Sequence, residues 1–119
     1  MHEWAIADNL VRLVTEAARK ENLAAVSRVV IKVGALRQVI PETLETAFEM
    51  LAGETEIAGA RLVTETVPLE VRCRSCGETT AEGGILFTCA HCAGGDLEIL
   101  SGKELYIDYI EGERKDVKE

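Results

Sequence analysis

Aromatic side chains, prolines and long apolar runs are all scarce in this chain. One Trp, two Tyr and two Phe are too few to fill a core, so Val, Ile and Leu must supply the buried apolar surface. No run is long and apolar enough to cross a bilayer, and no apolar leader opens the chain. We therefore expect a cytoplasmic protein with no membrane partner.

Basic side chains are outnumbered by acidic ones. Thirteen Lys and Arg stand against 21 Asp and Glu, which gives a formal net charge of −8. Proteins that bind nucleic acid neutralise its phosphates with a basic face, and Arg72 and Arg74 are only an isolated local exception here. The charge balance predicts no nucleic-acid partner.

Cysteine occurs only in two CxxC pairs, Cys73/Cys76 and Cys89/Cys92. Two residues between cysteines let one tight turn present two sulfurs, and the segment between the pairs can form the connecting loop. Four thiolates close the tetrahedral shell of Zn(II) and leave no position for substrate or water. The pattern predicts one structural zinc site, with two disulfides or a redox-active pair as the alternatives.

The spacing of apolar residues predicts an α/β (α+β) fold. Apolar positions three and four apart predict helices over residues 3–21 and 41–53, the second with Pro41 in its first turn. Runs rich in β-branched and other apolar residues predict strands over residues 27–36, 61–67, 97–100 and 104–110. The charged segment 111–119 should be a frayed tail.

Strand material resumes after the cysteines, which suggests an insertion. The simplest architecture is two helices on a three-stranded sheet, with an inserted zinc-ribbon module whose ligands are the four cysteines. Residues 1–69 and 102–119 would form the α/β domain, and residues 70–101 the zinc-binding domain.

The first residues, Met1-His2-Glu3, place an α-amine next to an imidazole. Bulky His2 should leave Met1 in place after synthesis. The amine, the backbone nitrogen of His2 and its ring nitrogen can then approach one ion, in the nitrogen-rich square-planar arrangement that Ni(II) and Cu(II) favour. A solvated N-terminus is the alternative.

Several short motifs follow one another in a fixed order over nearly the whole chain. They are Met1-His2-Glu3, Val33-Gly34-Ala35-Leu36, Pro41-Glu42, Ala47-Phe48-Glu49, Gly59-Ala60, the two CxxC pairs and Gly102-Lys103-Glu104-Leu105. In this order and spacing the chain resembles the HypA/HybF family of hydrogenase maturation nickel chaperones.

The resemblance implies a metallochaperone that delivers Ni(II) to the large subunit of [NiFe] hydrogenase, with a HypB-type GTPase as partner. It implies that His2 and Glu3, together with the amine of Met1, bind nickel as transient cargo. The structural Zn(II) would be bound by all four cysteines, Cys73, Cys76, Cys89 and Cys92.

Two positions depart from the family pattern. Several relatives place an acid directly before the position of Pro41, but this chain has Ile40, so Glu42 is the nearest carboxylate. The second CxxC commonly contains proline, whereas here it contains His91, which is either a solvated turn residue or an exchange ligand.

An enzyme is not expected, because the sequence has no nucleophile–base pairing, no glycine-rich phosphate loop and no open zinc position. The alternative function is a zinc-ribbon adaptor module that recruits a protein partner without metal cargo.

Overall fold

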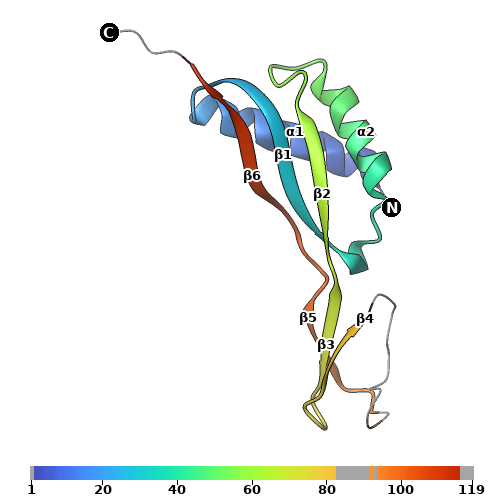
Figure 1. Cartoon of the computed structure of the whole chain (residues 1–119). Helices are drawn as coiled ribbons and strands as arrows, with labels where there is room; N and C mark the ends of the chain where they lie inside the picture. Colours follow the sequence, from blue (N-terminus) through green and yellow to red (C-terminus); the bar gives the residue numbers. More distant parts are fainter. Residues whose placement is uncertain (1, 83–91, 93, 116–119) are drawn as a thin grey trace. The chain divides into compact units, whose positions relative to one another are not determined.

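The computed structural model describes residues 2–82, 92 and 94–115. Its elements are α1 (Glu3–Lys20), β1 (Leu23–Gly34), a 3-10 helix η1 (Ala35–Arg37), α2 (Pro41–Ala52), β2 (Arg61–Val67), β3 (Leu69–Cys73), β4 (Thr79–Glu82), β5 (Leu97–Ser101) and β6 (Leu105–Arg114) (Figure 1). The chain divides into two compact units. The first comprises residues 1–31, 39–65 and 106–119, and the second comprises residues 32–38 and 66–105.

The first unit contains both helices and a three-stranded sheet in the order β2-β1-β6. Buried residues of α1 recur three or four apart and form one face: Ala7, Leu10, Val11, Val14 and Ala18. This helix crosses behind the sheet in Figure 1 and contacts α2. The mixed α/β class and the two helices on a three-stranded sheet are therefore confirmed. Neither described helix is long and apolar enough to span a membrane.

The core of the first unit is mainly aliphatic, as the scarcity of aromatics predicts. Val29 and Ile31 on the central strand β1 are fully buried, and Leu44 and Phe48 on α2 are fully buried as well. Pro41 occupies the first turn of α2, where its missing N–H costs no helical hydrogen bond.

The second unit contains an antiparallel sheet in the order β4-β3-β5. Burial alternates along β3, so that Leu69, Val71 and Cys73 lie on one covered face. The pairing of β3 with β5 shifts register between Glu70 and Val71 and then places Cys73 opposite Leu97. The last residue of the central strand, Cys73, therefore lies at the end of this sheet.

The predicted frayed tail is wrong for part of its length, because β6 continues to Arg114. Glu111 makes an ion pair of 3.1 Å with Arg28 of β1, and Gly112 lies so close to Ala25 that a Cβ there would overlap its backbone. Charged residues suit this position because β6 is an edge strand. Residues 116–119 lie outside the described residues.

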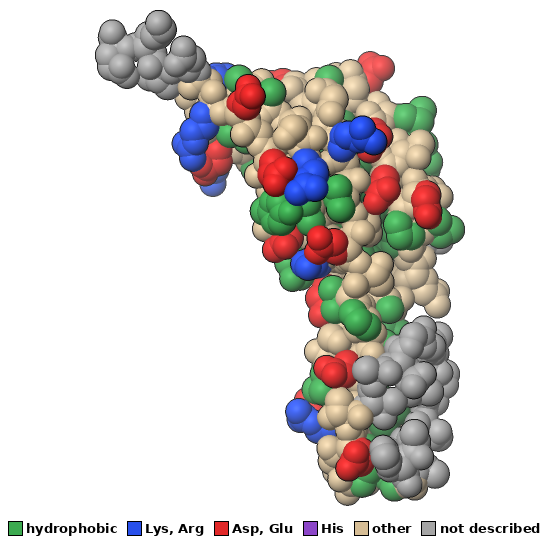
Figure 2. All heavy atoms as spheres, in the orientation of Figure 1, with side chains coloured by type: hydrophobic (Ala, Val, Ile, Leu, Met, Phe, Trp, Pro, Cys, Tyr) green, Lys and Arg blue, Asp and Glu red, His purple; other side chains and the backbone are tan. Residues whose placement is uncertain are grey.

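Several basic side chains are neutralised by an acid nearby. Arg72 of β3 pairs with Glu98 of β5 at 3.4 Å, and Arg74 pairs with Asp96 at 2.9 Å. On the face drawn in Figure 2, Lys and Arg side chains are interspersed with Asp and Glu. These pairs leave little uncompensated positive charge at Arg72 and Arg74, the isolated basic pair of the sequence.

The backbone of Gly34 lies against the backbone of Gly102. The N–H of Gly34 donates to the carbonyl of Glu104 at 2.7 Å, and the N–H of Leu36 donates to the carbonyl of Gly102 at 2.8 Å. A Cβ placed on Gly34 would overlap the carbonyl group of Gly102 and the nitrogen of Lys103. Only glycine therefore fits at position 34, although its φ of −70° is open to any residue.

Gly34→Ala should destabilise the protein by at least about 2 kcal/mol, because backbone cannot move aside as a side chain can. Gly53→Ala is the matched control. Its φ is −60° and a Cβ there would meet its nearest neighbour at 3.4 Å, so alanine should be neutral or stabilising. Urea unfolding followed by circular dichroism measures both, and equal midpoints for the two variants would contradict the close approach at Gly34.

Candidate metal centres

Three of the four cysteines come together in the second unit. The Sγ atoms of Cys73, Cys76 and Cys92 all lie within 4.8 Å of one another, and those of Cys73 and Cys92 are 3.6 Å apart. With Zn–S bonds of about 2.3 Å, sulfurs on a tetrahedral ion stand about 3.8 Å apart, so this donor set fits Zn(II). Cys89 and His91 lie outside the described residues.

The turn that presents Cys73 and Cys76 is held by backbone hydrogen bonds. The N–H of Cys73 donates to the carbonyl of Glu78 at 2.9 Å, and the N–H of Gly77 donates to the carbonyl of Cys73 at 2.7 Å. Gly77 has a φ of +81°, a left-handed conformation that favours glycine. The turn predicted from the sequence is present, and it brings the two sulfurs of the first CxxC pair together.

The same turn favours the thiolate form of Cys73. The pKa of this thiol is lowered to about 7, chiefly by the backbone N–H of Cys76, while burial acts in the opposite direction. The N–H of Ser75 and the neighbouring thiols of Cys92 and Cys76 lower it further. Because the thiolate is the form that binds metal, the protein itself prepares this ligand for an ion.

His2 lies at the exposed start of α1. Its backbone carbonyl accepts a hydrogen bond of 3.0 Å from the N–H of Ile6, which is the first turn of the helix. Its side chain makes no capping hydrogen bond. The imidazole is therefore not used in capping the helix, and it stands at the solvent-exposed end of the first unit. Met1 lies outside the described residues.

Glu3 is the only charged residue among the buried ones that the structure describes, with 7% of its surface exposed. Its Oε2 accepts a hydrogen bond of 3.0 Å from the backbone N–H of Ile40. This bond is the main reason why the pKa of Glu3 lies below its usual value, and the N–H of Glu3 itself adds to the effect. Glu3 thus ties the start of α1 to the residue that precedes α2.

Sequence reasoning missed this contact with Ile40. The only available signal was that the side chain of Ile40 cannot cap α2. Another group must therefore accept hydrogen bonds from the backbone N–H groups at that end of the helix. The Ile40 side chain is 55% exposed, and Glu42 lies exposed in the first turn of α2.

The candidate nickel residues form no side-chain cluster like that of the cysteines. Among the described residues, the three cysteines are the only group of three or more His, Cys, Asp or Glu whose ligand atoms converge. His2, Glu3 and Glu42 do not make such a group. Side chains alone therefore provide no three-ligand site at the start of the described chain.

Known proteins similar to this chain cover nearly all of it. Residues 1–112 match the family model HypA, described as hydrogenase/urease nickel incorporation, metallochaperone. The hydrogenase maturation factor HypA of Moorella thermoacetica is 37% identical over 113 residues, which are 95% of this chain and the whole of that protein. The HypA of Desulfosudis oleivorans is 41% identical over 113 residues, covering 93% of this chain and 97% of that protein.

Solved structures share the fold. The solution structure of the Ni metallochaperone HypA from Helicobacter pylori has a TM-score of 0.68 at 23% identity, and the match covers 97% of this chain and all of that one. A second solution structure of a HypA protein has a TM-score of 0.70 at the same identity, and the match covers 97% of this chain and 98% of that one. From the family match and from relatives above 30% identity over almost their full length, the chain belongs to the HypA family of nickel-incorporation metallochaperones.

Proposed function

We propose that this chain binds Ni(II) at its N-terminus and delivers it to the large subunit of [NiFe] hydrogenase. The observation that carries the proposal is the exposed His2 at the start of α1, whose side chain takes no part in capping the helix. The amine of Met1, the backbone nitrogen of His2 and its ring nitrogen would supply the nitrogen-rich shell that Ni(II) favours. Glu3 would complete the site through its backbone nitrogen or carboxylate.

Glu3 supports this ligand set by position. Its buried carboxylate is fixed by the N–H of Ile40, so the backbone beside His2 is held at the start of α1 instead of fraying. A chelate made of consecutive backbone and side-chain nitrogens needs this local order. Every rotatable bond that is disordered before the metal binds loses conformational entropy on binding, which weakens the affinity.

The exposure of the site suits a carrier and not a catalyst. A chaperone must release its ion, and an exposed terminal site lets acceptor ligands approach the metal. Nickel lies above cobalt and below copper in intrinsic affinity, so selectivity must come from geometry, metal availability and partner contact. Imidazole, amine and amide nitrogens all compete with protons, so nickel capture weakens as the pH falls.

The cysteines are proposed to hold structural Zn(II). Cys73, Cys76 and Cys92 converge, and Cys89 would provide the fourth thiolate of a closed shell. We propose residues 70–101 as the zinc-binding domain, and residues 1–69 with 102–119 as the nickel-binding domain. Reduced cysteines persist in the cytoplasm, where we place the protein.

The proposed partners are proteins. A HypB-type GTPase and the hydrogenase large subunit would exchange nickel with the N-terminal site. Arg72 and Arg74 are each paired with an acid, which supports the proposal that nucleic acid is not a partner.

Adding residues before Met1 should abolish nickel binding as fully as His2→Ala, because both changes remove one nitrogen from the same chelate. Isothermal titration with Ni(II) would compare the native protein, a form with Gly-Ser before Met1, and His2→Ala. The same Gly-Ser added after Glu119 is the control and should bind as the native protein does. Unchanged affinity in the N-terminally extended form would remove the amine from the site. No stoichiometric nickel on the native form would favour the adaptor function instead.

Cys73→Ala should release zinc and unfold the second unit, yet leave most of the helical signal, since α1 and α2 pack in the aliphatic core of the first unit. Ser75→Ala changes the same turn without removing a thiol and serves as the control. Zinc content by mass spectrometry and circular dichroism in the far ultraviolet give the two readouts. Total loss of helix in Cys73→Ala would show that the two units do not fold separately.

The GTPase should dock through the surface that carries His2 and Glu3, because ion transfer needs donor and acceptor ligands within coordination reach. Glu3→Ala, which removes the buried anchor that holds this surface at the start of α1, should therefore weaken the complex, whereas Arg74→Ala in the second unit should not. If the GTPase presents a basic patch, its association rate should also fall as salt rises. Surface plasmon resonance at two salt concentrations measures both effects. A loss confined to Arg74→Ala would place the docking surface on the second unit.

A further inference from the structure

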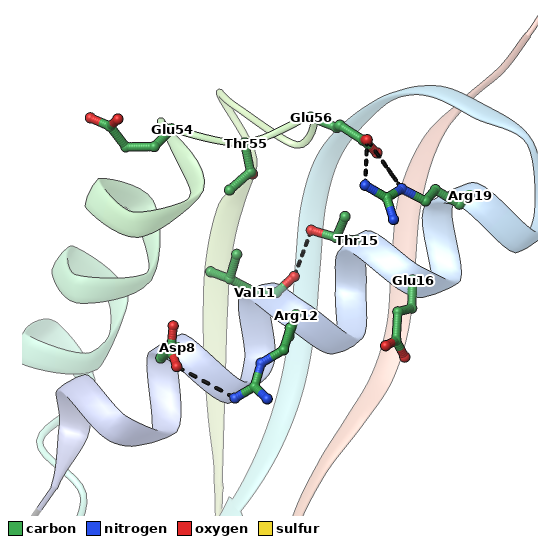
Figure 3. Close-up of a pocket in the computed structure, with 9 residues that line it drawn as sticks. All are labelled: Asp8, Val11, Arg12, Thr15, Glu16, Arg19, Glu54, Thr55 and Glu56. Atoms are coloured by element: carbon green, nitrogen blue, oxygen red, sulfur yellow. Dashed lines mark hydrogen bonds and ion pairs between the residues drawn. The ribbon is translucent and has the colours of Figure 1, made fainter.

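A groove of about 620 Å³ lies on the first unit (Figure 3). One wall is the side of α1 that runs from Asp8 to Arg19, and the other is the loop of residues 54–56 that follows α2. Neither the proposed nickel ligands nor the cysteines line it. The groove therefore needs an explanation of its own.

Acidic groups exceed basic groups in this groove. Arg19 is already held by Glu56, with Nε 2.9 Å from Oε1 and a terminal nitrogen 2.6 Å from Oε2, and Arg12 pairs with Asp8 at 3.4 Å. Among the described residues, neither Glu16 on α1 nor Glu54 on the loop has a side-chain hydrogen-bond or ion-pair partner.

Arg19 interacts much more strongly with Glu56 than with Glu16. Glu56 is the main cause of the raised pKa of Arg19, and Glu16 makes only the smallest contribution to it. Since Arg12 and Arg19 neutralise Asp8 and Glu56, the groove presents two uncompensated carboxylates, one on each wall.

The surface between these carboxylates is partly apolar. Val11 lines the groove and is almost fully buried. The hydroxyl of Thr15 donates to the carbonyl of Val11 at 2.7 Å, and that of Thr55 donates to the carbonyl of Ala52 at 2.8 Å. Because both hydroxyls are used locally, these threonines offer mainly methyl groups to an occupant.

Acidic walls around a partly apolar surface fit a long organic cation. In the described part of the chain, three or more ligand atoms converge only at the three cysteines, so the groove carboxylates do not form a metal cluster of that kind. A lysine or arginine can lay its alkyl stem on apolar surface and keep its charged head beside a carboxylate.

We propose that this groove docks a Lys- or Arg-bearing amphipathic segment of a protein partner. The groove is charge-complementary to such a segment, and the net charge of −8 on the whole chain attracts it from a distance. The proposal does not rest on nickel binding, because the groove includes no residue of the N-terminal site.

The test is an NMR titration of the full ¹⁵N-labelled chain with the peptide acetyl-Lys-Leu-Lys-Ala-Lys-Leu-Lys-amide. Shifts should concentrate in residues 11–16 and 54–56. The peptide in which every Lys is replaced by Glu should not bind. Shifts spread evenly over the acidic surface, or equal binding of the acidic peptide, would overturn the proposal. Equal occupancy by spermidine would make the groove a site for small cations and would also overturn it.

A charge-matched pair of variants separates docking from general attraction. Combining Glu16→Gln with Glu54→Gln should raise the Kd for the basic peptide about tenfold, since exposed ion pairs contribute modestly. Glu42→Gln with Glu49→Gln removes the same charge from exposed positions of α2 that do not line the groove. An equal rise of Kd in this control would contradict the proposal. All four glutamates are exposed, so both double variants should keep the native melting temperature.

Discussion

Contact between two glycine backbones sets the geometry around the end of β1. Gly34 is the last residue of β1, and Gly102 lies in the link between β5 and β6. No side chain fits between them, so the two segments approach closely enough for the hydrogen bonds from Gly34 to Glu104 and from Leu36 to Gly102. These bonds place β6 beside β1 from its first residues, and a shift of one residue would turn every β6 side chain to the other face.

The two candidate metal centres differ in the way that their proposed roles require. The cysteine turn is closed by backbone hydrogen bonds, its first thiol is buried, and its ligands are charged and soft, which suits an ion that stays. The start of α1 offers exposed nitrogen on a short terminal segment, which suits an ion that leaves. Glu3 holds this end of α1 in place without covering His2. Its buried carboxylate is bonded to the N–H of Ile40, while His2 remains exposed to solvent.

Features with a local cause were predictable from the sequence. The period of apolar residues and Pro41 predicted both helices to within one residue, and CxxC spacing predicted the convergence of Cys73 with Cys76. Features that depend on distant partners were not predictable. The extension of β6 depends on Arg28 and Ala25 of β1, and the bond from Ile40 to Glu3 spans 37 residues. Ile40 contributes a backbone N–H, which every residue but proline has, so its identity does not point to Glu3 as the partner.

The exposed part of α1 has two stretches, its N-terminal turn and the turns that line the groove. His2 and Glu3 lie at its N-terminal end, and its middle turns line the acidic groove. The opposite face of the helix is buried in the core. An amphipathic helix buries one face and leaves the other exposed, and in the functions proposed here α1 uses its exposed part twice, once for cargo and once for recognition. Arg12 and Arg19 line the groove, but each is paired with an acid. The groove therefore has a net negative charge. Local pairing, more than the net charge of the chain, thus decides which kind of partner α1 can receive.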